Sequence, residues 1–215
     1  MNASIYKIGY VSGLIAFIAT VAFCLVQIMQ LLGFLHYPWD EILIYGFSLC
    51  ITLPFIVEML ALHYVVAPEK KFWSHGALIF SIIYVVFVTA NYVVQLATVI
   101  PMTLKGESSQ IGLLVQSPHS LFWDYDAIGY LFMGFATLFA APIFEKTGTQ
   151  RWIRYTFYIH GTVTNVLIGF VYFYPNFSDK LLFIGFLWAI TAPLSMLLLA
   201  LHFKKHSLPK GQLAV

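Results

Sequence analysis

The stretch that decides the fold is GALIFSIIYVVFVTANYVVQLATVI, residues 76–100, which contains no Asp, Glu, Lys or Arg. An α-helix crosses the hydrocarbon core of a bilayer in about 20 mostly apolar residues. A transmembrane β-strand would instead alternate polar and apolar side chains over about 10 positions. The continuous apolar run therefore predicts a membrane-spanning helix rather than a strand.

Five further segments have the same character. They cover residues 8–35, 42–67, 123–144, 152–174 and 181–203. Of the 215 residues, 60% are hydrophobic and 9% are charged, whereas a soluble domain contains roughly 25% charged residues. This composition excludes a water-soluble enzyme and a disordered chain. It predicts an all-α fold, in which residues 1–215 form a single transmembrane domain of six helices.

Lys and Arg are distributed unequally between the two sides of such a bundle. If the spans alternate in direction, one side holds Lys7, Lys70, Lys71, Lys146, Arg151, Arg154, Lys204, Lys205 and Lys210. The other side holds Lys105 and Lys180, together with Asp40, Glu41, Glu107, Asp124, Asp126 and Asp179. Cytoplasmic loops are enriched in Lys and Arg. We therefore predict a multi-pass protein of a bacterial inner membrane with both termini in the cytoplasm.

Polar side chains recur along residues 76–100 at steps of three and four, as on one face of a helix. Polar groups at bilayer depth are costly and normally face the interior of a bundle. Amides there either orient a ligand through their donors and acceptors or join helices, at about 0.6 kcal/mol each. With polar residues of other spans, the candidate ligand-binding residues are Asn91, Gln95, Gln27, Asp126, Tyr130, Tyr84 and Asn165.

Three residues are candidates for acid–base chemistry: Glu58, His160 and Asp126. Glu58 and His160 each lie eight residues from the same predicted face of the membrane, which is about 12 Å along a helix. They are therefore predicted to be level and able to form a hydrogen bond or ion pair. Such a pair either fixes two helices or supplies the acid and base of an intramembrane enzyme acting on a lipid-like substrate.

Residues 102–122 form a long outer loop between the third and fourth spans. A loop of this length either covers a site or is a tolerated surface insertion. Near its end, Ser117-Pro118 predicts the start of a helix, with Ser as N-cap and Pro at the first helical position. This start would place Asp124 and Asp126 in the second turn.

Small residues form stripes on the first and last spans. They are Gly9, Gly13, Ala16 and Thr20, and Gly185, Ala189 and Ala192. Such stripes are typical of close packing between helices; if exposed, they would indicate a homo-oligomer or a non-catalytic membrane assembly protein. The histidines predicted on the outer side lack the spacing of a strong zinc motif, and His202 and His206, which are four residues apart, suit the polar end of a helix at the basic cytoplasmic tail. The net charge of +2 gives no argument for nucleic acid. We expect no metal, no cofactor and no nucleic-acid partner.

A set of short motifs lies between residues 91 and 154. They are Asn91-Tyr92 with Gln95 and Pro101, Gly106-Glu107, Pro118-His119, Asp126, Gly129-Tyr130-Leu131 with Met133, Leu138-Phe139-Ala140-Ala141-Pro142 with Phe144, and Arg151 with Arg154. This third of the chain resembles a family of uncharacterised bacterial and archaeal polytopic membrane proteins. The resemblance implies a helical membrane fold, points to Asn91, Gln95 and Asp126, and implies no particular reaction.

These observations favour a bundle with a polar pocket that opens outward or laterally. We expect Asn91, Gln95, Gln27 and Asp126 to line the pocket and the loop 102–122 to cover it. A mostly apolar wall with a few convergent polar groups is the usual composition of a ligand site. The leading hypothesis is that the protein binds or transports a small amphipathic molecule or lipid. The alternatives are the intramembrane enzyme and the assembly protein.

Overall fold

The computed structural model describes residues 2–174, 181 and 183–207, without the side chains of Asn2 and Phe183. Within these residues, six helices are long and apolar enough to cross a membrane. They are α1 (Asn2–Leu31), α2 (Trp39–Val65), α3 (Lys71–Val94, continued by the π-helix η2, Gln95–Val99, and by α4, Ile100–Leu104), α5 (Leu121–Ala140), α6 (Gln150–Phe173) and α8 (Phe186–Ser207). The all-α prediction is confirmed. Asp179, Lys180 and Lys210, which contribute to the predicted orientation, lie outside the described residues.

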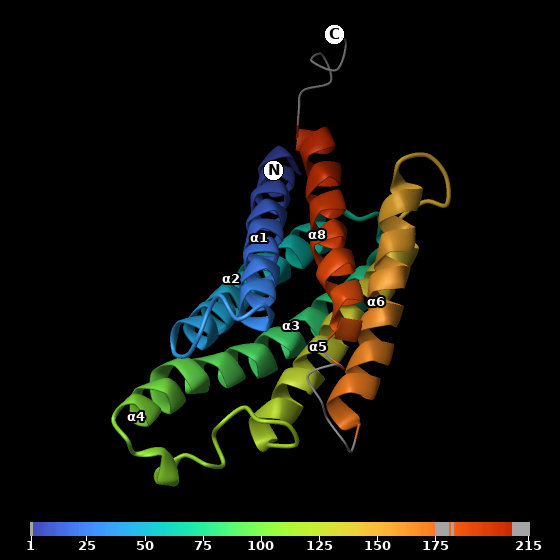
Figure 1. Ribbon diagram of the computed structural model, residues 1–215. Helices are drawn as coiled ribbons and strands as arrows, with labels where there is room; N and C mark the ends of the chain where they lie inside the picture. The colour runs from blue at the N-terminus through green and yellow to red at the C-terminus, as the bar shows by residue number, and fades with distance from the viewer. Residues whose placement is uncertain (1, 175–180, 182, 208–215) are drawn as a thin grey trace.

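The long helices form a closed ring. Each packs against its neighbours in the chain, and α8 packs against both α6 and α1. The start of α1 and the end of α8 lie at the same end of the bundle, and α4 lies at the opposite end (Figure 1). We call the first the basic end, because it carries Lys7, Lys70, Arg154 and Lys204. The other is the loop end, which carries residues 105–120.

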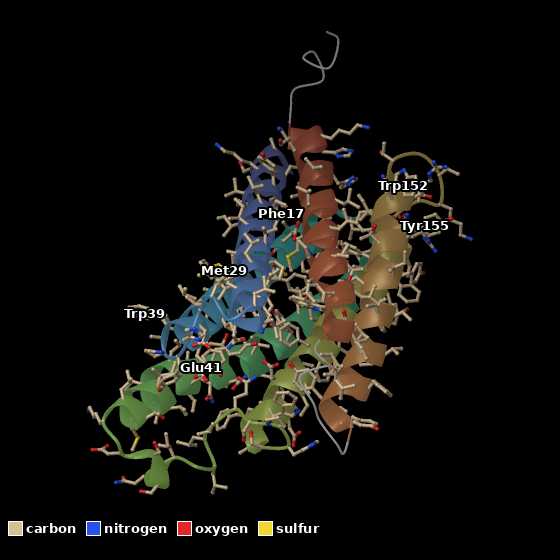
Figure 2. All side chains as sticks on the ribbon, in the orientation of Figure 1. Phe17, Met29, Trp39, Glu41, Trp152 and Tyr155 are labelled. Carbon is tan, nitrogen blue, oxygen red and sulfur yellow. The ribbon has the colours of Figure 1, made fainter. Side chains whose placement is uncertain are left out.

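The outer surface of the ring is apolar. Large side chains that are more than half exposed include Ile18, Leu53, Val86, Val166 and Ile190, on five different helices. Soluble proteins rarely expose continuous apolar surface of this kind, so it suits contact with lipid tails. Trp39 and Trp152 lie on the outside near opposite ends (Figure 2), as expected of indole side chains at the two membrane–water interfaces.

The small-residue stripe of α1 is buried inside the ring. Gly9, Gly13, Ala16 and Thr20 are all buried. A Cβ at Gly9 would lie 2.8 Å from the ring of Phe203 on α8, so the helices approach closely there. The stripe serves packing within the chain, and it leaves no small-residue face on α1 for the assembly-protein hypothesis.

Helices α5 and α6 cross through two facing glycines. A Cβ on Gly161 would lie 2.6 Å from the backbone oxygen of Gly134, and a Cβ on Gly134 would lie 3.2 Å from the backbone oxygen of Gly161. The side chain of Asn165 packs directly against Gly134. Neither position has room for a side chain, because Asn165 blocks it at Gly134, and Leu138 and the backbone oxygen of Gly134 block it at Gly161.

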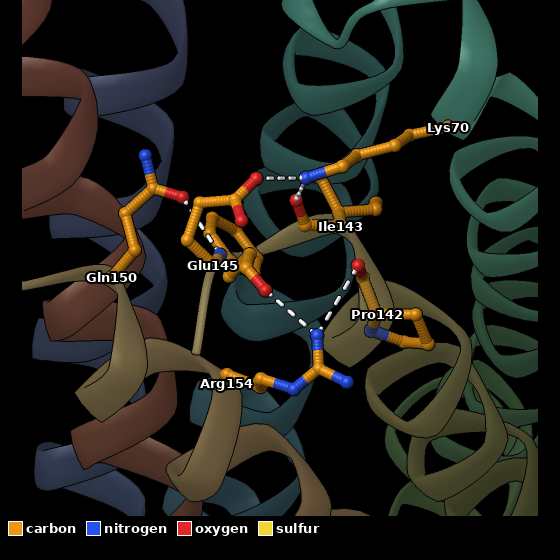
Figure 3. A network of polar contacts seen from close by, with 7 residues as sticks. Lys70, Pro142, Ile143, Glu145, Gln150 and Arg154 are labelled. Carbon is orange, nitrogen blue, oxygen red and sulfur yellow. Dashed lines mark hydrogen bonds and ion pairs between the residues drawn. The ribbon is translucent and has the colours of Figure 1, made fainter. Parts of the chain in front are cut away.

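A polar network at the basic end ties the α2–α3 connection to the α5–α6 connection (Figure 3). The Lys70 ammonium donates to the backbone oxygen of Ile143 at 2.7 Å and pairs with Glu145 Oε1 at 2.5 Å. The Arg154 guanidinium donates to the backbone oxygen of Phe144 at 2.8 Å, and Gln150 Oε1 accepts from the backbone N–H of Glu145 at 3.0 Å. These contacts hold the chain reversal between α5 and α6.

The Lys70–Glu145 pair predicts a pH-dependent stability difference. The hydrogen bond from Lys70, with its positive charge, lowers the pKa of the exposed Glu145 carboxyl. The pair therefore stabilises the folded state above the ordinary Glu pKa, and this contribution is lost as the pH falls through the lower folded-state pKa. We expect Glu145→Gln to have a slightly lower Tm than wild type at pH 7, and a smaller difference at about pH 3, below the ordinary Glu pKa.

The control for this experiment is Glu69→Gln, since Glu69 is an exposed carboxylate next to Lys70 in the sequence. Its Tm should match that of wild type at both pH values. A Tm difference for Glu145→Gln that persisted undiminished in acid would show that the ion pair is not its cause.

Candidate functional site

A cavity of about 430 Å³ lies inside the ring, towards the loop end. All six long helices contribute to its wall, through side chains that include Gln27, Tyr45, Tyr92, Asp126, Tyr172 and Trp188. Gln116 and Pro118 of the loop complete it. Ile28, Ile44 and Leu167 are among its apolar side chains. The cavity thus combines an apolar and aromatic wall with a few polar groups.

Asp126 is the buried carboxylate of this wall. It lies on α5, whose N-cap Ser120 accepts a hydrogen bond from the backbone N–H of Trp123. Asn91 donates to Asp126 Oδ1 at 3.2 Å, and the Tyr172 hydroxyl donates to Oδ2. Tyr172 is itself held by Trp123, whose indole N–H donates to its backbone oxygen at 3.1 Å. Two neutral donors therefore position the carboxylate, one from α3 and one from α6.

Aromatic side chains surround the carboxylate. The hydroxyls of Tyr92 and Tyr130 lie 3.2 Å apart, within hydrogen-bond distance. Tyr45 stacks on Tyr92 with ring centroids 5.3 Å apart, and Trp188 meets Tyr130 edge to face at 5.3 Å. The four side chains come from four helices, so the aromatic part of the wall depends on the closed ring.

A second acidic group enters the wall at the start of α2. Gln27 Nε2 donates to Gln30 Oε1 at 2.7 Å, and Gln30 Nε2 donates to Asp40 Oδ2 at 2.9 Å. Asp40 Oδ1 accepts from the backbone N–H of Glu41 at 2.9 Å, and Glu41 lines the cavity (its side chain is labelled in Figure 2). Glu41 is missing from the sequence-based candidates. The sequence feature that could have indicated it is its position at the outer end of a span, on the same side as the other carboxylates.

Asn91 and Gln95 do not line the cavity; they attach the loop to α3. Asn91 Nδ2 donates to Gln116 Oε1 at 2.9 Å, and Gln95 Nε2 donates to the backbone oxygen of Leu114 at 2.8 Å. Gln95 Oε1 also accepts from the backbone N–H of Gln116 at 3.1 Å. The two amides thus hold the segment whose Gln116 and Pro118 form part of the cavity wall.

Gln95 begins the five-residue π-helix that interrupts the third span. Pro101 lies two residues after the end of this π-helix, and its ring would clash with the carbonyl of Ala97 in a regular α-helix. A wider turn relieves that clash. π-Helical turns inside α-helices occur frequently at functional sites. This one carries Gln95, which binds the loop segment that forms part of the cavity wall.

The predicted start of the fourth span is wrong by three residues. The N-cap is Ser120 rather than Ser117, and α5 begins at Leu121. His119 has a φ of 66°, in the left-handed region, so no helix can run through it. Asp126 does lie in the second turn of α5, whereas Asp124 lies in the first.

The predicted Glu58–His160 pair is also wrong. Glu58 is fully buried with its carboxyl against Gly13 of α1, which Ala200 of α8 also approaches, and within the described part of the chain neither of its oxygens has a hydrogen-bond partner. His160 Nδ1 instead lies 3.0 Å from the hydroxyl of Thr191. Thr191 and Ala200 are nine residues apart on α8, about 13 Å along the axis.

The helices are tilted by different amounts (Figure 1), so equal counts of residues from the helix ends do not give equal depth. Neither Glu58 nor His160 lines the cavity. The enzyme hypothesis therefore loses this acid–base pair, and Asp126 is the remaining candidate that faces the cavity.

The other ligand-binding candidates divide into two groups. Gln27, Asp126 and Tyr130 line the cavity, whereas Tyr84 and Asn165 do not. Tyr84 is buried with its ring 5.5 Å from that of Phe55 and 5.9 Å from that of Tyr130. The Tyr84 hydroxyl and Asn165 Oδ1 have no hydrogen-bond partner among the described residues. Ligand binding by any of these side chains stays a prediction.

Comparisons of the chain with protein-family models, with curated proteins and with solved structures found no match. The resemblance over residues 91–154 therefore gains no support from a family match. The six long apolar helices support the more general conclusion that the chain is a multi-pass helical membrane protein. Among the described residues, no group of three or more His, Cys, Asp and Glu side chains is placed to hold a metal ion.

Proposed function

We propose that this multi-pass membrane protein binds or transports a small amphipathic molecule or lipid in the cavity at the loop end. The observation that carries the proposal is the cavity itself. Its volume of about 430 Å³ falls in the range of small-molecule sites, which are mostly apolar with a few well-placed polar groups. Gln27, Glu41 and Asp126 supply such polar groups in a largely apolar and aromatic wall.

We also propose that the basic end faces the cytoplasm, so that the cavity opens outward or laterally. The described Lys and Arg residues of the basic end are Lys7, Lys70, Lys71, Lys146, Arg151, Arg154, Lys204 and Lys205, against Lys105 at the loop end. This excess agrees with the enrichment of basic residues in cytoplasmic loops. A ligand would then reach the cavity past the loop or between helices, rather than from the cytoplasm.

A cavity-filling variant tests the binding function. Ala189 lines the cavity on α8, whereas its neighbour Ile190 faces outward and is 63% exposed. Ala189→Phe therefore places a phenyl group in the cavity, and Ile190→Phe places the same group on the outer surface of the bundle. Each protein is extracted from its native membrane directly into lipid nanodiscs, and the molecules that co-purify are identified by mass spectrometry.

We expect wild type and Ile190→Phe to retain the same enriched small molecule or lipid, and Ala189→Phe to lose it. A matching elution volume and Tm of the two variants excludes unfolding as the reason. Equal enrichment in all three proteins, or no enriched species in wild type, would contradict the proposed function.

A further inference from the structure

We infer that the ligand of this cavity carries a positively charged head group of the alkylammonium type on an apolar tail. The inference rests on the proposed function and names the class of molecule that the cavity takes. Three features of the wall support it: the sign of its charges, the aromatic faces around them, and the apolar surface beside them.

The cavity wall is acidic and has no charge to balance it. Glu41 and Asp126 contribute carboxylates, and none of the described residues of the wall is Lys, Arg or His. The ion pair found among the described residues, Lys70–Glu145, lies at the basic end of the bundle and involves neither carboxylate. Asp40, which accepts hydrogen bonds from Gln30 and from the backbone of Glu41, lies beside the wall. Buried charges in proteins are normally paired, so a cationic ligand supplies the missing partner and an anionic ligand is repelled.

The aromatic groups of the wall favour an organic cation over a metal ion. Tyr45, Tyr92, Tyr130, Tyr172 and Trp188 line the cavity together with Asp126. The face of an aromatic ring carries negative potential that attracts a cation, and cages of such rings are the usual means of recognising quaternary ammonium groups. A small metal ion would instead need several oxygen ligands to replace its hydration shell. The described residues contain no cluster of three or more His, Cys, Asp or Glu side chains placed to hold a metal ion.

The remaining wall fits an apolar tail. Ile28, Ile44, Leu167 and Ile168 line the cavity and offer no hydrogen-bonding side chain. An amphipathic cation thus matches both parts of the cavity.

The test compares three probes with the same eight-carbon tail and different head groups: octyltrimethylammonium, N-octylacetamide and octyl sulfate. Binding is measured by isothermal titration calorimetry with the full-length protein in nanodiscs, and the signal of empty nanodiscs is subtracted. We expect the cation to bind wild type at least about tenfold more tightly than the neutral or the anionic probe.

Two carboxylate variants and one control locate that preference. Asp126→Asn and Glu41→Gln should each weaken binding of the cation by at least about tenfold, whereas Asp124→Asn, on the same helix but outside the cavity wall, should not. Glu41 lies at the start of α2 and is half-buried, so its variant remains informative if Asp126→Asn does not fold. Unchanged binding of the cation to the folded carboxylate variants would overturn the inference.

The outcomes separate this inference from the proposed function. If the three probes bind wild type equally and Ala189→Phe abolishes their binding, the cavity is a binding site without charge preference, and the inference alone fails. If the cation binds Ala189→Phe as tightly as wild type, the cavity is not the site of the cation and the inference fails, whereas the molecules that co-purify still decide the proposed function. If wild type binds no cation, the inference fails, and the molecules that co-purify decide the proposed function independently.

Discussion

Gly161→Ala is expected to lower the free energy of unfolding by about 1–3 kcal/mol, the usual cost of overpacking a closely packed interior. The added Cβ would lie 2.6 Å from the backbone oxygen of Gly134. Backbone on a neighbouring helix cannot rotate away as a side chain can, so α5 and α6 must separate. Because Asp126 of α5 and Tyr172 of α6 share a hydrogen bond, that separation also disturbs the cavity wall. The measurement is a reversible unfolding titration in mixed detergent micelles.

Gly169→Ala is the matched control. Gly169 lies on the same helix, and a Cβ there meets nothing within 4 Å. The substitution should leave stability unchanged or raise it by up to about 1 kcal/mol through helix propensity. Equal free energies of unfolding for the two alanine variants would show that the close approach of α5 and α6 at Gly134 and Gly161 does not stabilise the protein.

Glu58→Met is expected to act in the opposite direction and to stabilise the protein by about 1–3 kcal/mol, the cost of leaving a buried polar group without a partner. Glu58 is fully buried, and neither carboxyl oxygen has a hydrogen-bond partner among the described residues. Methionine has a similar length and flexibility and fills irregular interior space without a strongly polar group. The same titration measures the change.

The control here is Glu58→Gln, which keeps a polar group of the same shape in the same place. It should gain less stability than Glu58→Met, since an amide without partners is also costly to bury. A loss of stability in Glu58→Met would show that the carboxyl has favourable interactions that its contact with Gly13 does not reveal.

The number and type of the long helices follow from the sequence because each depends on local composition. A run such as residues 76–100 has no charged side chain, and in a bilayer a helix is the way for one segment to satisfy its own backbone groups. The buried stripe of Ser81, Tyr84, Asn91 and Gln95 follows as well, because the period of the helix and the cost of polar groups in lipid are both local properties.

The partners of these side chains do not follow, because they depend on how the helices tilt and where the loop returns. Asn91 and Gln95 bind Gln116 and Leu114 of the loop, and nothing in the spacing of residues 76–100 indicates that segment. Counting residues from the helix ends predicts that Glu58 and His160 lie at the same depth in the membrane, whereas the different tilts of the helices separate them. Glu41 reaches the cavity because α2 begins beside the end of α1, where Gln30 binds Asp40.

The order of helices around the ring has a consequence for biosynthesis. Five of the six contacts between neighbouring helices join segments that are consecutive in the chain, so each pair can pack soon after its second member enters the membrane. The contact between α1 and α8 joins the first helix to the last and must wait until translation is nearly complete. Until then, Gly13 and the carboxyl of Glu58 that packs against it lack the approach of Ala200 from α8. A nascent chain that stalls before α8 would therefore leave this polar group facing the lipid or the insertion machinery, whereas the complete ring buries it.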